Sequence, residues 1–219
     1  ETPTAKPLGV FARPVETTGW KSWLFSVDHK KIGIMYGAAS LFFFAIGGVE
    51  ALLIRTQLAR PGQKVLSADL YNQVFTMHGV TMIFLVVMPL AAAFANFLIP
   101  LQIGARDVAF PRLNLLSFWI YMLGGCFFVY ILLSGVLHAA FGTNLPGGLG
   151  LDTGWTFYTP YSTARAQGAV VAATLGAFIL GFSSILTGVN FIATTHMLRP
   201  TGMTWFRMPL FLWSMYSTS

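Results

Sequence analysis

Long apolar runs, separated by short polar segments, organise this chain. Four runs are long enough to cross roughly 30 Å of hydrocarbon as helices, and they cover residues of about 32–54, 74–99, 115–137 and 167–194. A fifth run, 209–219, is too short to cross, so we expect it to be the start of a span that the chain does not complete. The pattern predicts an all-α, polytopic membrane helix bundle of four full transmembrane helices plus the start of a fifth.

Composition places the chain in lipid. Hydrophobic residues make up 55% of it and charged residues 9%, and the mean hydropathy is +0.68. A water-soluble domain of this size could not bury so much apolar surface. The one cysteine, Cys126, lies inside an apolar run, which excludes a disulfide framework and a thiolate metal cage within this chain.

The net charge of +6 predicts no nucleic-acid partner, because the basic residues lie mostly between apolar runs, where they act as topology signals. Nine lie in the N-terminal segment 1–31 and in the second and fourth loops, and four lie on the opposite side. The nine are Lys6, Arg13, Lys21, Lys30, Lys31, Arg106, Arg112, Arg199 and Arg207, and the four are Arg55, Arg60, Lys64 and Arg165. This excess predicts a cytoplasmic N-terminus, or one in the matrix for a mitochondrial protein.

His78 is the first candidate for chemistry. It lies in the motif Thr76-Met77-His78-Gly79 near the outer end of the second run, where an imidazole without a partner is costly. A neutral imidazole beside a small residue can bind the iron of a flat haem. A histidine that bonds to a neighbouring helix would give the same pattern, so the sequence pattern alone leaves both interpretations open.

Asp107 is the second candidate, at the inner mouth between the second and third runs. A carboxylate there can collect protons, and six small polar residues could hold a file of water molecules that leads inward. These six are Asn96, Asn114, Ser117, Ser183, Ser184 and Asn190. Alternatively, Asp107 pairs with Arg106 or Arg112 or caps a helix, and the small polar residues only join helices by hydrogen bonds.

Arg55 and Glu50 lie near the outer end of the first run. The Arg55 guanidinium could donate to a polar group beside His78, or it could extend toward the headgroups. An unpaired Glu50 would be costly in lipid, so it either pairs with Arg55 or faces a lumen. The sequence assigns Glu50 no role.

The remaining histidines, His29, His138 and His196, all lie at the ends of apolar runs. We expect water or headgroups to satisfy them there, in structural roles. Trp155 lies in the outer loop after the third run, a place typical of the interfacial aromatic belt.

Together, these motifs resemble the N-terminal portion of subunit I of the haem-copper respiratory oxidases of the cytochrome c oxidase type. The resemblance runs nearly from end to end, and the stretch around Asp107 is its most specific part. It is carried by residues 28–33 (DHKKIG), 53–55 (LIR), 76–79 (TMHG), 82–84 (MIF), 100–114 (PLQIGARDVAFPRLN), 154–156 (GWT), 183–186 (SSIL) with Asn190, and 209–214 (PLFLWS).

The resemblance implies roles for these residues. His78 matches an axial ligand of the low-spin haem, expected to be haem a, and Arg55 matches an arginine that hydrogen-bonds the haem formyl group. Asp107 matches the entrance of a proton channel, and the six small polar residues match positions along it. Trp155 and Tyr158 match an outer-loop motif over the haem region. The ligands of the high-spin haem and of copper are expected beyond residue 219, so this chain alone would not be catalytically complete.

Three positions depart from the family pattern. Arg106 stands where a proline is usual, and Leu180 stands where many members have a channel serine. Gln57 replaces an acidic residue that helps to hold a structural cation in some members, so we expect no such cation site here.

The sequence therefore predicts part of the catalytic subunit of a terminal oxidase, which reduces dioxygen to water with electrons from cytochrome c and couples this to proton translocation. A quinol-oxidising member is an alternative, and a non-redox transporter or channel, or a structural anchor subunit, are rivals from other classes. The expected partners are oxidase subunits II and III, cytochrome c or another electron donor, and the lipid bilayer. Arg106 and the segment Ala91-Ala92-Ala93 favour a bacterial plasma membrane over the mitochondrial inner membrane.

Overall fold

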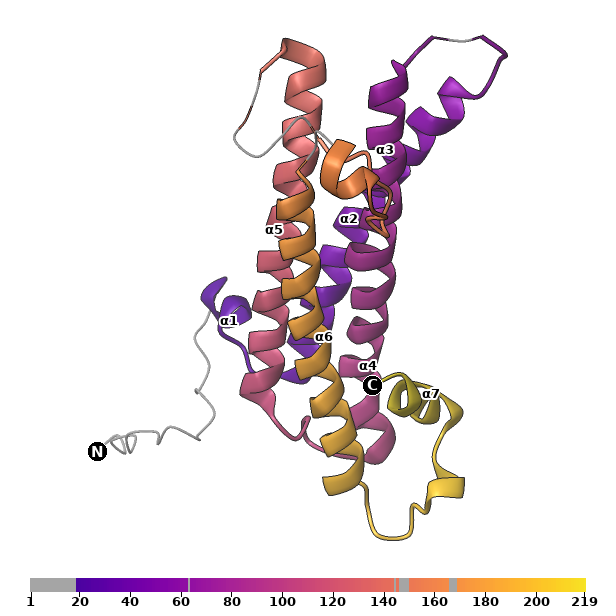
Figure 1. The fold of residues 1–219 in the computed structure, drawn as a ribbon. Helices are drawn as coiled ribbons and strands as arrows, with labels where there is room; N and C mark the ends of the chain where they lie inside the picture. The colour runs from indigo at the N-terminus through magenta and orange to yellow at the C-terminus, as the bar shows by residue number, and fades with distance from the viewer. Residues whose placement is uncertain (1–18, 63, 144, 146–149, 166–168) are drawn as a thin grey trace, which may run out of the picture.

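A computed structural model describes residues 19–62, 64–143, 145, 150–165 and 169–219. All regular structure within these residues is helical, as the apolar pattern predicted (Figure 1). The elements are, in chain order, α1 (Lys21–Leu24), α2 (His29–Gln57), α3 (Ala68–Val80), the π-helical segment η1 (Thr81–Val87), α4 (Met88–Ile103), α5 (Pro111–Phe141), the π-helical turn η2 (Tyr161–Arg165), α6 (Val170–Met197), the 3-10 turn η3 (Trp205–Arg207) and α7 (Leu210–Thr218).

Within the described part of the chain, four helices are long and apolar enough to cross a membrane. They are α2 with 29 residues, the continuous helix α3–η1–α4 with 36, α5 with 31 and α6 with 28. Three of the four expected runs fall inside one of these helices, and the fourth does so from 170 onward, since its expected start at 167 lies outside the described residues. The short run at 209–219 matches α7, and the expected N-terminal segment is described only from residue 19.

Local sequence explains where the long helices begin and end. The Asp28 carboxylate caps α2 by accepting hydrogen bonds from the backbone N–H groups of Lys30 and Lys31, at 2.8 and 3.1 Å. Glycines in the left-handed conformation end two helices, Gly104 after α4 with φ 69° and Gly142 after α5 with φ 67°. Such a φ favours glycine because it has no Cβ.

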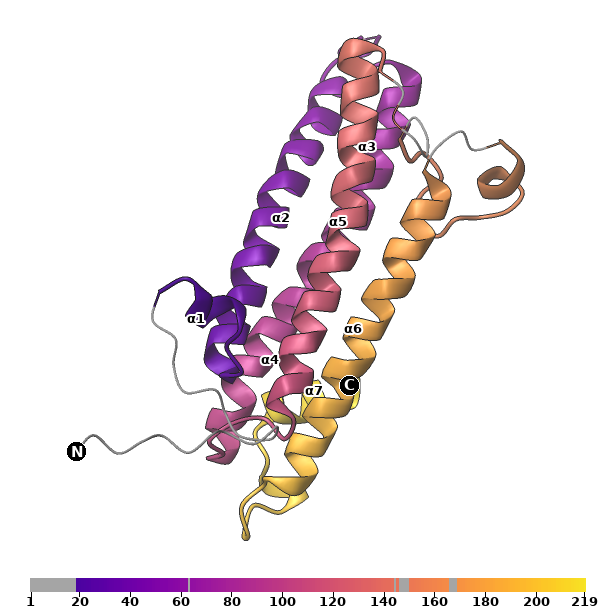
Figure 2. The same cartoon turned by 90° about the vertical axis from the view of Figure 1, so that its left-hand side faces the viewer.

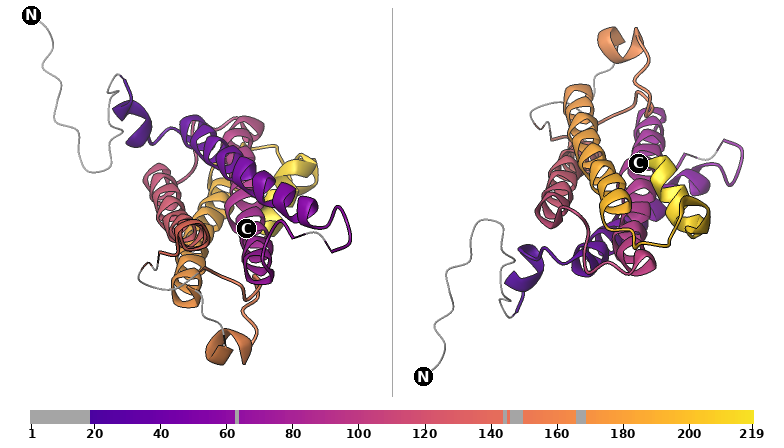
Figure 3. Two further views of the ribbon diagram at one scale, coloured as in Figure 1. Left: turned by 90° about the horizontal axis from the view of Figure 1, so that it is seen from above. Right: turned by 90° about the horizontal axis from the view of Figure 1, so that it is seen from below.

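The long helices form one elongated bundle (Figure 2). Helix α5 packs mainly against α6, and α2 packs mainly against α4 and η1. Seen along the bundle, these two pairs lie side by side, with α7 beside α4 and α6 (Figure 3). The turn between α4 and α5 lies at one end of the bundle, here called the Asp107 end, and the loop between α2 and α3 lies at the other, the His78 end (Figure 1).

Two apolar clusters hold the bundle together. The larger joins α2, η1, α5 and α6 around fully buried side chains such as Tyr36, Leu85 and Phe128. The smaller lies near the Asp107 end, where Ile99 of α4, Phe191 of α6 and Leu212 of α7 meet. Most other large apolar side chains of the long helices are exposed, as expected for surfaces that face lipid or further protein.

Candidate functional site

His78 lies on α3, two residues before that helix ends and η1 begins. Its Nδ1 forms a hydrogen bond of 2.9 Å with the backbone carbonyl oxygen of Gly47 on α2. A carbonyl only accepts, so Nδ1 carries the proton and Nε2 keeps its lone pair. Histidines that bind metals commonly donate the other ring N–H to a backbone carbonyl in this way. The interhelical bond and the free lone pair on Nε2 together fit an axial ligand of haem iron.

The loop after α5 lies against the same turn of α3. The hydroxyl of Thr76 accepts a hydrogen bond from the backbone N–H of Gly154 at 3.0 Å. Trp155 follows, and a Cβ added to Gly79 would lie 3.8 Å from the indole Cδ1 of Trp155. Thr76 thus holds the tryptophan loop beside His78, which agrees with the expected place of Trp155; Tyr158 of the same loop is 76% exposed.

Arg55 and Glu50 do not pair with each other. Arg55 is exposed and Glu50 is only 4% exposed, because five residues along an α-helix place the two side chains about 140° apart. Both carboxyl oxygens of Glu50 are buried and make no hydrogen bond within the described part of the chain. Among the described residues, no hydrogen bond joins Arg55 to His78.

At the other end of the bundle, Asp107 lies in the turn between α4 and α5 and is 8% exposed. Its Oδ1 accepts a hydrogen bond of 2.8 Å from the backbone N–H of Val108. Arg106 is exposed, so the carboxyl group points into the bundle while the neighbouring cation faces out. The structure therefore buries the residue that the sequence singled out at this mouth.

Two residues of α6 hold the Asp107 turn in place. The amide of Asn190 accepts from the backbone N–H of Phe110 at 2.9 Å and donates to the Phe110 carbonyl at 3.2 Å. The hydroxyl of Thr194 accepts from the backbone N–H of Ala109 at 2.8 Å. Both polar atoms of the Asn190 side chain are thus used, so its role in the structure is to position this turn.

A chain of hydroxyl groups crosses from α5 to α6. Ser117 donates to the Asn114 carbonyl at 2.7 Å, and Ser183 donates to the Ser117 carbonyl at 2.7 Å. The hydroxyl of Tyr36, on α2, lies 3.1 Å from Ser117 Oγ and 3.5 Å from Ser183 Oγ. Thr187 donates to the Ser183 carbonyl at 2.9 Å. Three helices therefore meet at one polar network, and Tyr36 is its central member.

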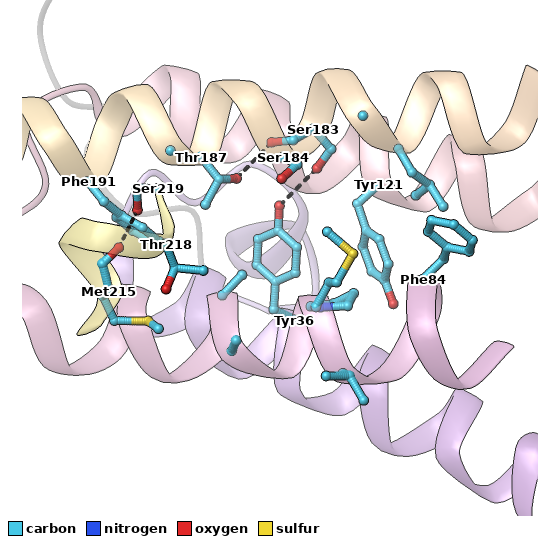
Figure 4. Close-up of a pocket in the computed structure, with 18 of the residues that line it drawn as sticks. Tyr36, Phe84, Tyr121, Ser183, Ser184, Thr187, Phe191, Met215, Thr218 and Ser219 are labelled. Carbon is cyan, nitrogen blue, oxygen red and sulfur yellow. Dashed lines mark hydrogen bonds between the residues drawn. The ribbon is translucent and has the colours of Figure 1, made fainter. Parts of the chain in front are cut away.

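This network borders a cavity of about 370 Å³ between α2, α4, α6 and α7. Figure 4 shows Tyr36 pointing across the cavity toward Ser183 and Thr187, with Ser184 beside them. Its other walls are mainly apolar and include Phe84, Leu180 and Phe191. Leu180 lines the cavity beyond Ser183, so the departure from a channel serine replaces a polar wall by an apolar one.

Asn96 and Asn114 are fully buried, and their side-chain amides lack some or all of their hydrogen bonds within the described residues. The side-chain N–H of Asn96 donates to the Ala92 carbonyl at 2.9 Å, whereas its Oδ1 makes no hydrogen bond within the described residues. Neither Oδ1 nor Nδ2 of Asn114 makes one there. Buried amide groups of this kind are suited to binding water.

Tyr36, Thr187 and Thr194 belong to the site, although the sequence did not single them out. An aromatic residue in an apolar run is typical of a packed core, and threonine is common in membrane helices. The available signal was periodicity, because Ser183, Thr187, Asn190 and Thr194 recur at helical spacing on one face of α6.

Each of the other three histidines makes a hydrogen bond to a protein group. His29 is 2% exposed and its Nδ1 lies 2.9 Å from the backbone oxygen of Asn96, so α2 and α4 are joined at the Asp107 end. His138 bonds to the Thr143 carbonyl at 3.3 Å and His196 to the Tyr216 hydroxyl at 3.0 Å. These protein partners add to the expected water or headgroup contacts, and the structural roles of the three histidines stay a prediction.

Two kinds of comparison with known proteins bear on this site. The family model described as cytochrome C and Quinol oxidase polypeptide I matches residues 31–219. Cytochrome c oxidase subunit 1 of Bacillus subtilis (strain 168) is 45% identical over 205 residues, which cover 93% of this chain and 31% of that protein. The protein of the same name from Bacillus sp. (strain PS3) is 47% identical over 198 residues, 90% of this chain and 30% of the relative.

A similar relative comes from another bacterial group. The probable cytochrome c oxidase subunit 1-alpha of Streptomyces avermitilis is 46% identical over 198 residues, which cover 90% of this chain and 32% of the relative. The chain thus spans about a third of the length of the curated relatives it matches.

Proposed function

This chain belongs to the family of cytochrome c and quinol oxidase polypeptide I, and on that premise we propose that it forms the first part of the catalytic subunit of a terminal respiratory oxidase. The complete subunit would reduce dioxygen to water with electrons from cytochrome c and couple this to proton translocation. A quinol-oxidising member of the same family is the alternative donor class. Family membership favours both over the transporter, channel and anchor interpretations.

The observation that carries this proposal is the environment of His78. Its Nδ1 proton is held by the Gly47 carbonyl, so Nε2 is the nitrogen that would bind the iron of the low-spin haem, with haem a as the expected type. A haem bound there would supply reversible one-electron transfer. The protein would fix the plane of the imidazole through the Gly47 carbonyl. It would also hold the Trp155 loop beside His78 through Thr76. Arg55 would donate to the polar edge of the macrocycle.

The proton-supplying part of the proposal starts at Asp107. Its buried carboxyl group would take up protons at the Asp107 end and pass them to water held by Asn96 and Asn114, whose amide atoms are unsatisfied within the described residues. Ser117, Tyr36 and Ser183 continue the route as a hydroxyl chain, and Ser184 borders the cavity beyond it. Asn190 supports the entrance by holding its turn.

The proposal also covers the remaining cofactor ligands, the partner subunits and the localisation. The ligands of the high-spin haem and of copper would lie beyond residue 219, and oxidase subunits II and III and an electron donor would be the partners. The protein would be a multi-pass protein of a bacterial plasma membrane with a cytoplasmic N-terminus, so that Asp107 faces the cytoplasm.

The test is a reduced-minus-oxidised optical spectrum of the purified oxidase complex. We expect His78→Ala to remove the low-spin haem band selectively, because the iron loses an axial ligand. His138→Ala is the matched control, because this histidine bonds only to a loop carbonyl beyond the end of the bundle in the described structure. An unchanged band in His78→Ala, or a wild-type complex without haem, would contradict the proposal.

A further inference from the structure

The second membrane-spanning helix changes its helical period between His78 and Asn96. Its segment η1, Thr81–Val87, is π-helical, and the backbone N–H of Met88 donates to the carbonyl of Ile83, five residues back. A π turn takes one residue more than an α turn, and such turns commonly lie at functional sites. Here the π turn lies between the candidate iron ligand and the candidate proton route.

This change of period sets the angle, around the helix axis, between the His78 and Asn96 side chains. Eighteen residues separate His78 from Asn96, which is about five turns of a regular α-helix, so a regular helix would direct both side chains to one face. One additional residue in the π segment turns the second half by about 100° relative to the first. Without η1, either His78 or Asn96 would point to the wrong neighbour.

Pro89 explains why the regular period fails at this place. It has no backbone N–H, and its ring would collide with the carbonyl four residues before it, which belongs to Leu85. The Leu85 side chain is only 1% exposed, and a carbonyl in a membrane interior needs a donor from the protein. The Tyr121 hydroxyl on α5 donates to it at 3.0 Å.

The ring of Tyr121 is held by packing against other aromatic rings. Removing its hydroxyl would therefore remove the hydrogen bond to Leu85 and leave the ring in place. It packs against the Tyr36 ring with centroids 5.4 Å apart and against Phe118 at 6.2 Å. Next to it, Phe84 of η1 stacks on Phe128 of α5 with centroids 6.2 Å apart. Figure 4 shows Tyr121 beside Phe84, along the bundle from Tyr36.

We propose that Tyr121 is a positioning residue: by donating to the Leu85 carbonyl it holds the π turn that sets the angle between His78 and the polar network. This inference rests on the proposed function, because it treats His78 as the iron ligand. Tyr121→Phe keeps the ring and removes only the donor. Tyr36→Phe is the matched control, since it removes a neighbouring hydroxyl that bonds to α5 and α6 instead of η1.

Hydrogen exchange of the complete oxidase, read by mass spectrometry on the peptide that covers residues 81–90, gives the first readout. Loss of one buried hydrogen bond of about 1 kcal/mol should make exchange there about fivefold faster in Tyr121→Phe. The electron paramagnetic resonance signal of the ferric low-spin haem gives the second, because it depends on the orientation of the axial imidazole. We expect this signal to shift in Tyr121→Phe and to stay in place in Tyr36→Phe.

A third variant tests whether Tyr121 acts on η1 through the Leu85 carbonyl. Pro89→Ala restores an N–H four residues after Leu85, so Tyr121→Phe should accelerate exchange less than about twofold in that background. Equal acceleration in both backgrounds, or unchanged exchange and an unchanged haem signal in Tyr121→Phe, would overturn the inference. A wild-type complex without the haem signal would instead count against the proposed function, while exchange would still decide whether Tyr121 holds η1.

Discussion

Each hydroxyl of the polar network has a single proton, and this fixes the direction of its hydrogen bonds. Ser117 and Ser183 use their protons on backbone carbonyls, so the Tyr36 hydroxyl must donate to one of the two serine oxygens. It lies 3.1 Å from Ser117 and 3.5 Å from Ser183, and a small rotation moves its proton from one to the other. On the proposed proton route, Tyr36 would therefore be the residue that connects the hydroxyl group of α5 with that of α6.

Tyr36→Phe tests this role at the scale of a residue. We expect steady-state proton uptake by the oxidase in vesicles to slow by a factor of about ten, since one hydroxyl of the route is lost while the ring still packs on Phe118 and Tyr121. Tyr71→Phe, at the His78 end, is the control. Equal uptake rates in the two variants would remove Tyr36 from the route.

Asp107→Asn should have a larger effect, because it removes the ionisable group at the entrance. We expect proton uptake from the Asp107 side to fall by a factor on the order of a hundred, with the optical spectrum of the haem groups retained. Asp69→Asn, in the first turn of α3 at the opposite end, is the control. Normal uptake in Asp107→Asn would show that protons enter elsewhere.

The sequence singled out His78, Asp107 and three serines, but it did not single out Tyr36, Thr187 or Thr194. His78 and Asp107 stand out because charged or imidazole side chains are costly near apolar runs. Tyr36 does not, since its ring fits a core as well as Phe would, and only the structure shows which neighbours its hydroxyl reaches. The resemblance had named Asn190 as a channel residue, but its bonds to Phe110 are visible only in three dimensions.

At the scale of elements, α5 and α6 approach each other closely at Gly124. A Cβ on Gly124 would lie 2.7 Å from side-chain atoms of Leu180 and 3.2 Å from the Gly176 carbonyl oxygen. Small residues permit such an approach in lipid, where packing replaces the hydrophobic effect between helices. The apolar runs predicted both helices, yet the pairing of α5 with α6 includes this close contact and could not be derived from hydropathy.

Gly124→Ala should therefore destabilise the complex by about 1–3 kcal/mol, because the added Cβ would displace the Leu180 side chain and would lie 3.2 Å from the Gly176 carbonyl oxygen in the α6 backbone. The measurement is thermal unfolding of the purified complex in detergent. Gly37→Ala is the control, since its added Cβ would meet only Ala93 at an ordinary 3.8 Å. The loss should shrink in a Leu180→Ala background, and an undiminished loss there would contradict this account.

The period change at η1 is the element that no hydropathy pattern indicates. A 36-residue helix with one π segment and one with a regular period have the same apolar profile. Pro89 in the sequence indicates a disturbance of this helix, but a proline allows a kink, a bulge or a helix end. The donor on a neighbouring helix, Tyr121, decides among these outcomes.

At the scale of the whole molecule, the two ends of the bundle have different chemistry. The His78 end carries the candidate haem ligand and the tryptophan loop, and the Asp107 end carries the carboxyl group and its supporting turn (Figure 1). Under the proposed function, a membrane that separates these ends would separate electron transfer at His78 from proton uptake at Asp107. The distribution of Lys and Arg predicts which end faces the cytoplasm.

Thiol labelling in oriented vesicles checks that prediction. In a Cys126→Ala background, which removes the chain's one cysteine, a membrane-impermeant maleimide should label Arg207→Cys only from the cytoplasmic side and Lys64→Cys only from the opposite side. Both positions are exposed. The reverse pattern would show that the Asp107 end faces away from the cytoplasm.

The turn that carries Asp107 joins α4 to α5, yet its backbone is bonded to Asn190 and Thr194 of α6. During synthesis, the ribosome produces α4 and α5 before it has translated α6. The turn would therefore emerge with its N–H groups of Ala109 and Phe110 still unpaired. Three inserted spans are not enough to shape the Asp107 turn, which takes its form only when the fourth enters the bilayer and docks.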